Sequence, residues 1–258
     1  MSFKKTARKA IANVAYAVIK RTAPAAYAQD GLATVHAHEF LEDPRFKAAY
    51  ARGLAAIGTS DDYQWHWRIH VGLWAATLAS KLDGDFVECG VNKGFLSSAI
   101  MKYLNWNSLN KSFYLLDTFN GLDERSLTAD EISAGARQKN DHNLATGFYV
   151  GNIEGVTRNF SAWHRVHIVQ GSIPETLPRA TPERVAYLHI DMNCAPPEVA
   201  ALSFYWDKLI PGAVVLLDDY AYFGFRPQKV AMDEFAASKG VEICSLPTGQ
   251  GLLFKPPA

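Results

Sequence analysis

The chain has few cysteines, no long apolar run and no excess of charge of either sign. Its 258 residues contain three cysteines, Cys89, Cys194 and Cys244, which lie far apart and show no C-x-x-C spacing. They therefore predict neither a disulfide framework nor a zinc site, and they favour a reducing, cytoplasmic compartment. No apolar run reaches the roughly 18 to 20 residues that a helix needs to span a bilayer.

The charge balance excludes one broad class of partner. Lysine plus arginine number 26, and aspartate plus glutamate also number 26. Proteins that bind nucleic acid usually carry a basic excess, so we expect no nucleic-acid partner. Apolar residues make up 48% of the chain, which is enough for a full hydrophobic core and excludes a disordered composition. The length suits one α/β domain with additional segments.

The first twenty-one residues combine a short apolar stretch with basic residues at both ends. Ile11, Val14 and Val18 share one helical face, a pattern typical of a helix that lies on a membrane surface or on a partner subunit. Peripheral membrane contact through this helix is therefore one interpretation. The alternatives are a solvated helix and a cleaved signal peptide, although Lys20 and Arg21 stand where a secretory signal would not favour them.

Two regions differ in pattern. We expect residues 1–81 to form an N-terminal helical extension and residues 82–258 to form a cofactor-binding domain. In the second region, short apolar runs alternate with amphipathic stretches, and continuous Val, Ile and Leu runs are typical of strands covered on both faces. The predicted strands are DFVECG, SFYLLD, RVHIVQG, VAYLHID, AVVLLDD, VEICSL and GLLFK.

These strands and the intervening helices predict a fold. Helices are expected over residues 95–104, 197–209 and 227–238, and the short segment PTGQG permits only a hairpin between the last two strands. We therefore predict a Rossmann-like, doubly wound α/β sheet of seven strands, mostly parallel, with a C-terminal antiparallel hairpin and additional N-terminal helices. This architecture is typical of class I methyltransferases rather than dinucleotide dehydrogenases. The long polar segment 120–163 is expected to form a partly helical lid.

Acidic residues stand at the ends of four predicted strands. They are Glu88, Asp117, Asp191 and the pair Asp218 and Asp219. Each alone is also explained as a helix cap. Carboxyl ends of parallel strands meet at one sheet edge, where doubly wound proteins bind their ligands. Because buried carboxylates are costly unless they are paired or bound, five acids at one edge predict a ligand site.

The first two acids indicate a nucleoside site. Glu88 is followed by the turn GVNKG, in which Gly90 and Gly94 allow the backbone to approach a ligand closely. This turn is not the G-x-G-x-x-G fingerprint of dinucleotide-binding proteins. Asp117, at the end of the second strand, stands where a ribose would offer its hydroxyls.

The other three acids indicate a hard cation. Asp191, Asp218 and Asp219 supply only oxygen ligands, which suit Mg²⁺, and no histidine or cysteine stands at zinc spacing. His189, inside a predicted strand, is interpreted as a core residue.

Together these motifs resemble a known family. The segments GDFVECGVNKGFLSSAI, FYLLDTFNGLDE, GSIPETLP, AYLHIDMN, GAVVLLDDYAYFG and PQKVAMDEF, in this order over residues 82–255, resemble the TylF family of macrocin-type sugar O-methyltransferases. The resemblance implies S-adenosylmethionine and Mg²⁺ as cofactors and a sugar or glycoside as acceptor. It also implies roles for residues: cofactor contacts from Glu88, Gly90, Asp117, Gly171, Ser172 and Asp191, and metal ligands Asp191, Asp218 and Asp219.

One position departs from the family pattern. Members usually carry a second acid two residues after the first metal aspartate, as proposed general base, whereas this chain reads Asp191-Met192-Asn193. An amide orients a hydroxyl but does not accept its proton usefully. Three interpretations follow: the metal alone acidifies the acceptor hydroxyl, another group such as His142 in the lid takes the proton, or the chain binds cofactor with little turnover.

Other functions stay open on the sequence alone. A nicotinamide-dependent oxidoreductase is the main rival, against which the missing glycine fingerprint and the closing hairpin argue. A glycolipid acceptor would give the basic N-terminal helix a purpose. We also expect a homo-oligomer, although the sequence states neither the number of subunits nor which hydroxyl is methylated.

Overall fold

The computed structural model describes residues 27–58 and 62–257, so the predicted basic N-terminal helix lies outside the described residues. A seven-stranded sheet forms the centre, in the order β5-β4-β3-β6-β7-β9-β8, with only the last two strands antiparallel to their neighbours. The prediction of a doubly wound, mostly parallel sheet with a terminal hairpin is therefore confirmed. The strands are β3 (Asp85–Cys89), β4 (Phe113–Asp117), β5 (Val166–Gln170), β6 (Val185–Ile190), β7 (Leu209–Leu217), β8 (Cys244–Ser245) and β9 (Gly251–Phe254).

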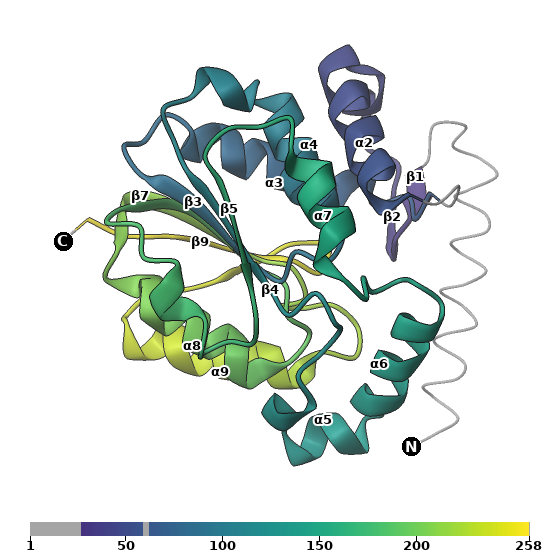
Figure 1. Cartoon of the computed structure of the whole chain (residues 1–258), viewed down its shortest axis with the longest axis vertical. Helices are drawn as coiled ribbons and strands as arrows, with labels where there is room; N and C mark the ends of the chain where they lie inside the picture. Colours follow the sequence, from purple (N-terminus) through teal and green to yellow (C-terminus); the bar gives the residue numbers. More distant parts are fainter. Residues whose placement is uncertain (1–26, 59–61, 258) are drawn as a thin grey trace.

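Helices cover both faces of this sheet (Figure 1). Helices α2 (Pro44–Ile57), α3 (His66–Ala79) and α4 (Phe95–Tyr103) pack on one face, and α8 (Ala195–Trp206) and α9 (Arg226–Ser238) pack on the other. Successive strand residues alternate between the two cores: Phe86 belongs to the first and Val87 to the second. Two covered faces explain why the strand sequences are continuously apolar.

The described part of the N-terminal region is not purely helical. It begins with a hairpin of β1 (Tyr27–Gln29) and β2 (Leu32–Thr34), followed by a short 3₁₀ helix η1 (Glu39–Glu42) and then α2 and α3. The turn of the hairpin is Asp30-Gly31, and both residues have positive φ, as tight hairpins require. Helices α2 and α3 contribute to the same core as β3 and β6, so they are part of the sheet domain.

The segment between β4 and β5, residues 120–163, is partly helical and is here called the insertion. It contains η3 (Glu124–Ser126), α5 (Ala129–Ser133), α6 (Ala136–Ala145) and α7 (Ile153–Phe160). Helices α5 and α6 stand apart from the sheet, whereas α7 returns toward α4 (Figure 1). No helix among the described residues is both long and apolar enough to cross a membrane.

Candidate active site

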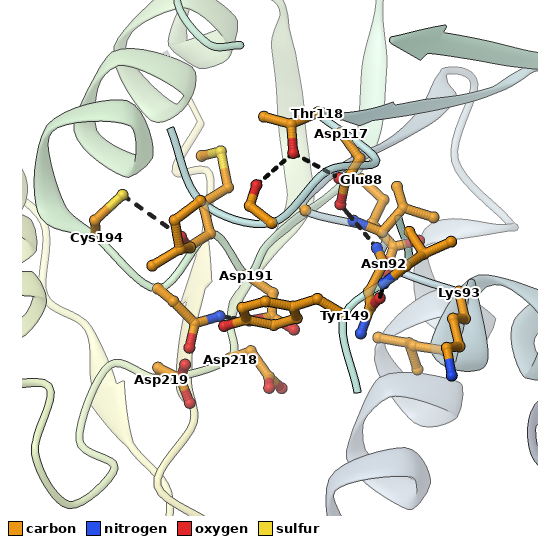
Figure 2. A pocket seen from close by; sticks show the side chains of 18 of the residues that line it. Glu88, Asn92, Lys93, Asp117, Thr118, Tyr149, Asp191, Cys194, Asp218 and Asp219 are labelled. Atoms are coloured by element: carbon orange, nitrogen blue, oxygen red, sulfur yellow. Dashed lines mark hydrogen bonds between the residues drawn. The ribbon is translucent and has the colours of Figure 1, made fainter. Parts of the chain in front are cut away.

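A cavity of about 390 Å³ lies at the carboxyl ends of β3, β4, β6 and β7. The structure brings nearly every residue predicted for the site into its wall, as Figure 2 shows for the acids. The predicted residues that line it are Glu88, Gly90, Asp117, Gly171, Ser172, Asp191, Asn193, Asp218 and Asp219. His142 is not brought there: its side chain is exposed on α6, and its neighbours Lys139 and Asn143 line the cavity instead.

The turn after β3 shows why glycine stands at position 90. Gly90 has a φ of +89°, and a Cβ there would overlap the carbonyl oxygen of Asp191. The turn therefore passes directly against the end of β6. Gly94, with a φ of +85°, leaves room for the ring of Phe160 from α7. Both glycines permit close packing against other parts of the protein, and their expected close approach to a ligand stays a prediction.

Asp117 holds this turn in place. Its carboxylate accepts hydrogen bonds from the backbone N–H groups of Val91 at 2.7 Å, Asn92 at 2.8 Å and Phe119 at 2.6 Å, with the Thr118 hydroxyl at 3.3 Å. A carboxylate offers about four lone-pair positions, so these donors occupy it fully. A ribose hydroxyl would have to share this carboxylate, and fixing the turn is the role that the contacts show.

Glu88 has an unused oxygen inside the cavity wall. Its side chain is only 3% exposed, and Oε1 lies 2.9 Å from Nδ1 of His189. The other oxygen, Oε2, is buried without a hydrogen-bond partner among the described residues. A buried carboxylate oxygen without a donor is costly, so this atom fits a ligand that brings a donor.

Arg68 of α3 is a residue of the site that the sequence did not reveal. It is 8% exposed and forms ion pairs with three aspartates: Nε lies 3.1 Å from Asp30, Nη2 lies 3.2 Å from Asp219, and Nη1 contacts Asp218. The planar guanidinium suits such multiple pairing. No spacing or composition around position 68 predicts a buried arginine.

Asp218 is surrounded by protein donors. Besides Arg68, its Oδ1 accepts from Nε2 of Gln250 at 2.9 Å and lies 3.8 Å from Nε2 of His189. Burial alone would raise the pKa of Asp218, but the charges of Arg68 and His189 outweigh it and hold this pKa well below its usual range. Asp218 is therefore a carboxylate whose charge is already balanced by the chain.

Asp191 and Asp219 have fewer partners. Among the described residues, Asp191 accepts one side-chain hydrogen bond, from Asn193 at 3.2 Å, and Asp219 pairs only with Arg68. Burial and the neighbouring aspartates raise the pKa of Asp191 well above its usual value, and burial and Asp218 raise that of Asp219 to about 7. Such excess negative charge fits a bound cation.

The donor set fits a hard cation only in part. As their side chains lie, the described residues form no group of three or more His, Cys, Asp or Glu that could hold a metal ion. Asp218 is instead in contact with Arg68 and Gln250. Asp191 and Asp219 keep free oxygens and fit a cation that retains water, as Mg²⁺ commonly does.

The side-chain amide of Asn92 fastens residues 148–150 of the insertion to the glycine turn. Nδ2 of Asn92 donates to the carbonyl of Phe148 at 3.0 Å, and Oδ1 accepts from the N–H of Val150 at 2.8 Å. Tyr149, between these two anchored residues, lies in Figure 2 between Asn92 and the acids Asp191 and Asp219. This clamp therefore sets how the insertion covers the cavity.

Replacing Asn92 with glycine tests the clamp without adding strain at its φ of +50°. Two hydrogen bonds are lost, each worth about 1 kcal/mol, so we expect amide exchange at Val150 to become at least about tenfold faster. Hydrogen exchange with mass spectrometry measures this. Asn107, which makes the same two-bond contact with Ala162 and His164 away from the cavity, is the matched control. Unchanged exchange at Val150 would contradict the clamp.

Comparison with known proteins places the chain in a family. The family model described as macrocin-O-methyltransferase (TylF) matches residues 71–244, which is more than half of the chain. The chain belongs to the TylF family. The matched region runs from α3 to β8 and contains every cavity residue predicted from the sequence.

Individual relatives of the TylF family are more distant. An 8-demethyl-8-(2,3-dimethoxy-alpha-L-rhamnosyl)-tetracenomycin-C 4'-O-methyltransferase of Streptomyces olivaceus is 28% identical over 149 residues, which cover 56% of each chain. Mycinamicin III 3''-O-methyltransferase of Micromonospora griseorubida is 26% identical over 153 residues, covering 56% of this chain and 58% of that protein. The chain thus spans somewhat more than half the length of these relatives.

Solved structures agree on the fold. The O-methyltransferase NovP has a TM-score of 0.61 and 22% identity, covering 74% of this chain and 80% of its own. CalS11, a calicheamicin methyltransferase, has a TM-score of 0.51 and 14% identity, with 82% and 93% covered. At these identities the likeness shows the fold alone, which is the class I methyltransferase fold.

Proposed function

We propose that this TylF-family chain transfers a methyl group from S-adenosylmethionine to a hydroxyl of a sugar or of a glycosylated small molecule. The observation that carries the proposal is that Glu88 lines the same cavity as Asp191 and Asp219 and has a buried oxygen, Oε2, without a hydrogen-bond partner among the described residues. In this proposal the carboxylate of Glu88 binds the cofactor, and those of Asp191 and Asp219 serve the acceptor. Membership of the family, and relatives named as methyltransferases of glycosylated compounds, support the acceptor class.

The part of the cavity at Glu88, Gly90 and Asp117, here called the cofactor side, fits the methionine part of S-adenosylmethionine. Bound S-adenosylmethionine supplies a methyl group activated by its sulfonium. The ammonium of its methionine part is a donor of the kind that Oε2 of Glu88 lacks. Gly90, Gly171 and Ser172, which the resemblance implies as further cofactor contacts, line the same cavity. Asp117 would act chiefly by fixing the turn and would share one oxygen with the ribose.

The part of the cavity at Asp191, Asp218 and Asp219, here called the acceptor side, fits two neighbouring hydroxyls of a sugar. Mg²⁺ at this place would lower the pKa of an acceptor hydroxyl and fix its oxygen. In this proposal Asp191 and Asp219 hold the cation, and Asp218 pairs with Arg68, which also contacts Asp219, instead of acting as the third ligand. Asn193 orients Asp191 through its amide and does not take the proton.

The test combines binding and transfer. S-Adenosylhomocysteine is titrated calorimetrically into the chain, and a labelled methyl group is then followed from S-adenosylmethionine to p-nitrophenyl α-L-rhamnoside and a panel of other glycosides. We expect one equivalent to bind and the label to reach a glycoside. Binding of NAD⁺ in place of S-adenosylhomocysteine would contradict the proposal and favour the oxidoreductase.

Removal of divalent metal distinguishes the metal's role in methyl transfer from cofactor binding. With EDTA we expect methyl transfer to fall at least about tenfold, because the cation acts on the acceptor hydroxyl. Binding of S-adenosylhomocysteine should stay within about threefold, since Glu88 and the glycine turn need no metal. A transfer rate that EDTA leaves unchanged would remove the cation from the proposal.

A second candidate is a cofactor-binding protein with weak turnover, favoured by the amide at position 193. Asn193 donates to Asp191, so the wall offers no proton acceptor at that point. General bases commonly contribute about 10² to 10⁴ in rate. If Asn193→Asp gains about 10² or more, the weak-turnover candidate is supported, whereas a change below about tenfold supports an active enzyme that does not use this position as a base.

A further inference from the structure

A row of polar side chains crosses four adjacent strands at the edge of the cavity. Glu88 of β3 and His189 of β6 are direct partners in the parallel register, and His189 is in turn the partner of Leu216 in β7. Asp218 follows two residues after Leu216 and so points to the same face, toward α3. Gln250 stands immediately before β9, the next strand in the sheet.

Contacts join this row from end to end. Nδ1 of His189 lies 2.9 Å from Oε1 of Glu88, and Nε2 lies 3.8 Å from Oδ1 of Asp218. Gln250 donates to the same oxygen of Asp218, whose other oxygen contacts Arg68. His189 is 2% exposed, so water does not screen these contacts. The row thereby connects the cofactor side of the cavity with its acceptor side.

The imidazole of His189 donates to Glu88. Its Nδ1 makes the 2.9 Å contact with Oε1, because an ionised carboxylate only accepts. Its Nε2 lies 3.8 Å from Asp218 and has no hydrogen-bond partner among the described residues. An apolar side chain would satisfy packing at this position, as Tyr187, Leu188 and Ile190 do beside it. A histidine there serves Glu88.

We propose that His189 is a positioning residue for the cofactor, which holds Oε1 of Glu88 so that Oε2 faces the ammonium of S-adenosylmethionine. The inference rests on the proposed function, because it assigns the free oxygen to that ligand. Glu88 has no other described hydrogen-bond partner, so its orientation depends on this one imidazole. Without the imidazole, the Glu88 side chain would be free to change rotamer, and its carboxylate would no longer be held in position to bind the ammonium.

The test is a double-mutant cycle read by titration with S-adenosylhomocysteine. His189→Leu and Glu88→Gln should each weaken binding at least about tenfold, in line with hydrogen bonds to charged groups. If His189 acts through Glu88, the double variant should bind within about threefold of Glu88→Gln alone. The positioning role would be overturned if the double variant lost affinity by the product of the two single losses. It would also be overturned if His189→Leu bound S-adenosylhomocysteine with full affinity.

Two conservative variants keep the test independent of folding. The side-chain nitrogen of His189→Asn stands near the position of Nδ1 and should restore most of the affinity, whereas His189→Gln carries its amide further out and should not. Thermal unfolding shows whether both variants are folded. Equal affinity of the two folded variants for S-adenosylhomocysteine would contradict the positioning role of His189. A wild-type chain that does not bind S-adenosylhomocysteine would overturn the proposed function, and binding with an additive cycle would overturn only the role of His189.

Discussion

Replacing Arg68 with methionine is expected to lower the free energy of unfolding by about 3 to 5 kcal/mol, the range seen when one partner of a buried ion pair is removed. The variant leaves Asp30, Asp218 and Asp219 close together without their common cation. Arg68 also joins the hairpin of β1 and β2 to the end of β7, so its loss weakens a contact between distant parts of the chain. Urea unfolding of the purified variant measures the change.

The control for this prediction is an exposed arginine. Arg184 pairs with Asp83 at 3.6 Å, and the two side chains are 57% and 89% exposed. Exposed pairs contribute about 0 to 1 kcal/mol, so Arg184→Met should change the free energy of unfolding by no more than that. Similar losses in both variants would show that Arg68 is not the central counter-ion of the acidic site.

A Gly90→Ala substitution is expected to weaken binding of S-adenosylhomocysteine at least about 100-fold. The added Cβ overlaps the carbonyl oxygen of Asp191, and a φ of +89° is strained for alanine. The turn and the end of β6 must therefore move apart, which displaces Glu88 and Asp191 together. Misplacement of site groups by about 1 Å is enough for an effect of this size. Calorimetric titration of the folded variant measures it.

Gly151→Ala, in the insertion, is the matched control for the substitution at Gly90. Gly151 has an ordinary φ, and a Cβ there meets no atom within 4 Å. Its affinity for S-adenosylhomocysteine should equal that of the wild type. Wild-type affinity in Gly90→Ala would mean that the close approach of the turn to Asp191 has no part in binding the cofactor.

The sheet and the acidic edge could be predicted because both follow from local patterns. Continuous apolar runs such as VAYLHI identify strands that are covered on both faces, and parallel strands necessarily bring their carboxyl ends to one edge. Glu88 and Asp191 belong to different strands, yet the fold alone is sufficient to place them in one cavity. Their residue types then indicate the chemistry of the site from the sequence alone.

Contacts that depend on tertiary packing could not be predicted in this way. Arg68 comes from a helix whose pattern gives no sign that its side chain is buried among aspartates. The sequence indicates only a core residue at His189, because the register that pairs it with Glu88 exists only in the assembled sheet. The β1–β2 hairpin was missed, although its Asp30-Gly31 turn is a hairpin signal, because the surrounding residues were interpreted as helical.

A crystal structure of the chain with S-adenosylhomocysteine would test the assignment of the cavity most directly. We predict the ammonium of the ligand within about 3 Å of Oε2 of Glu88, the distance of a charge-assisted hydrogen bond, and its sulfur facing Asp191. A ligand bound outside the cavity, or inside it with the ammonium turned away from Glu88, would contradict the division into a cofactor side and an acceptor side.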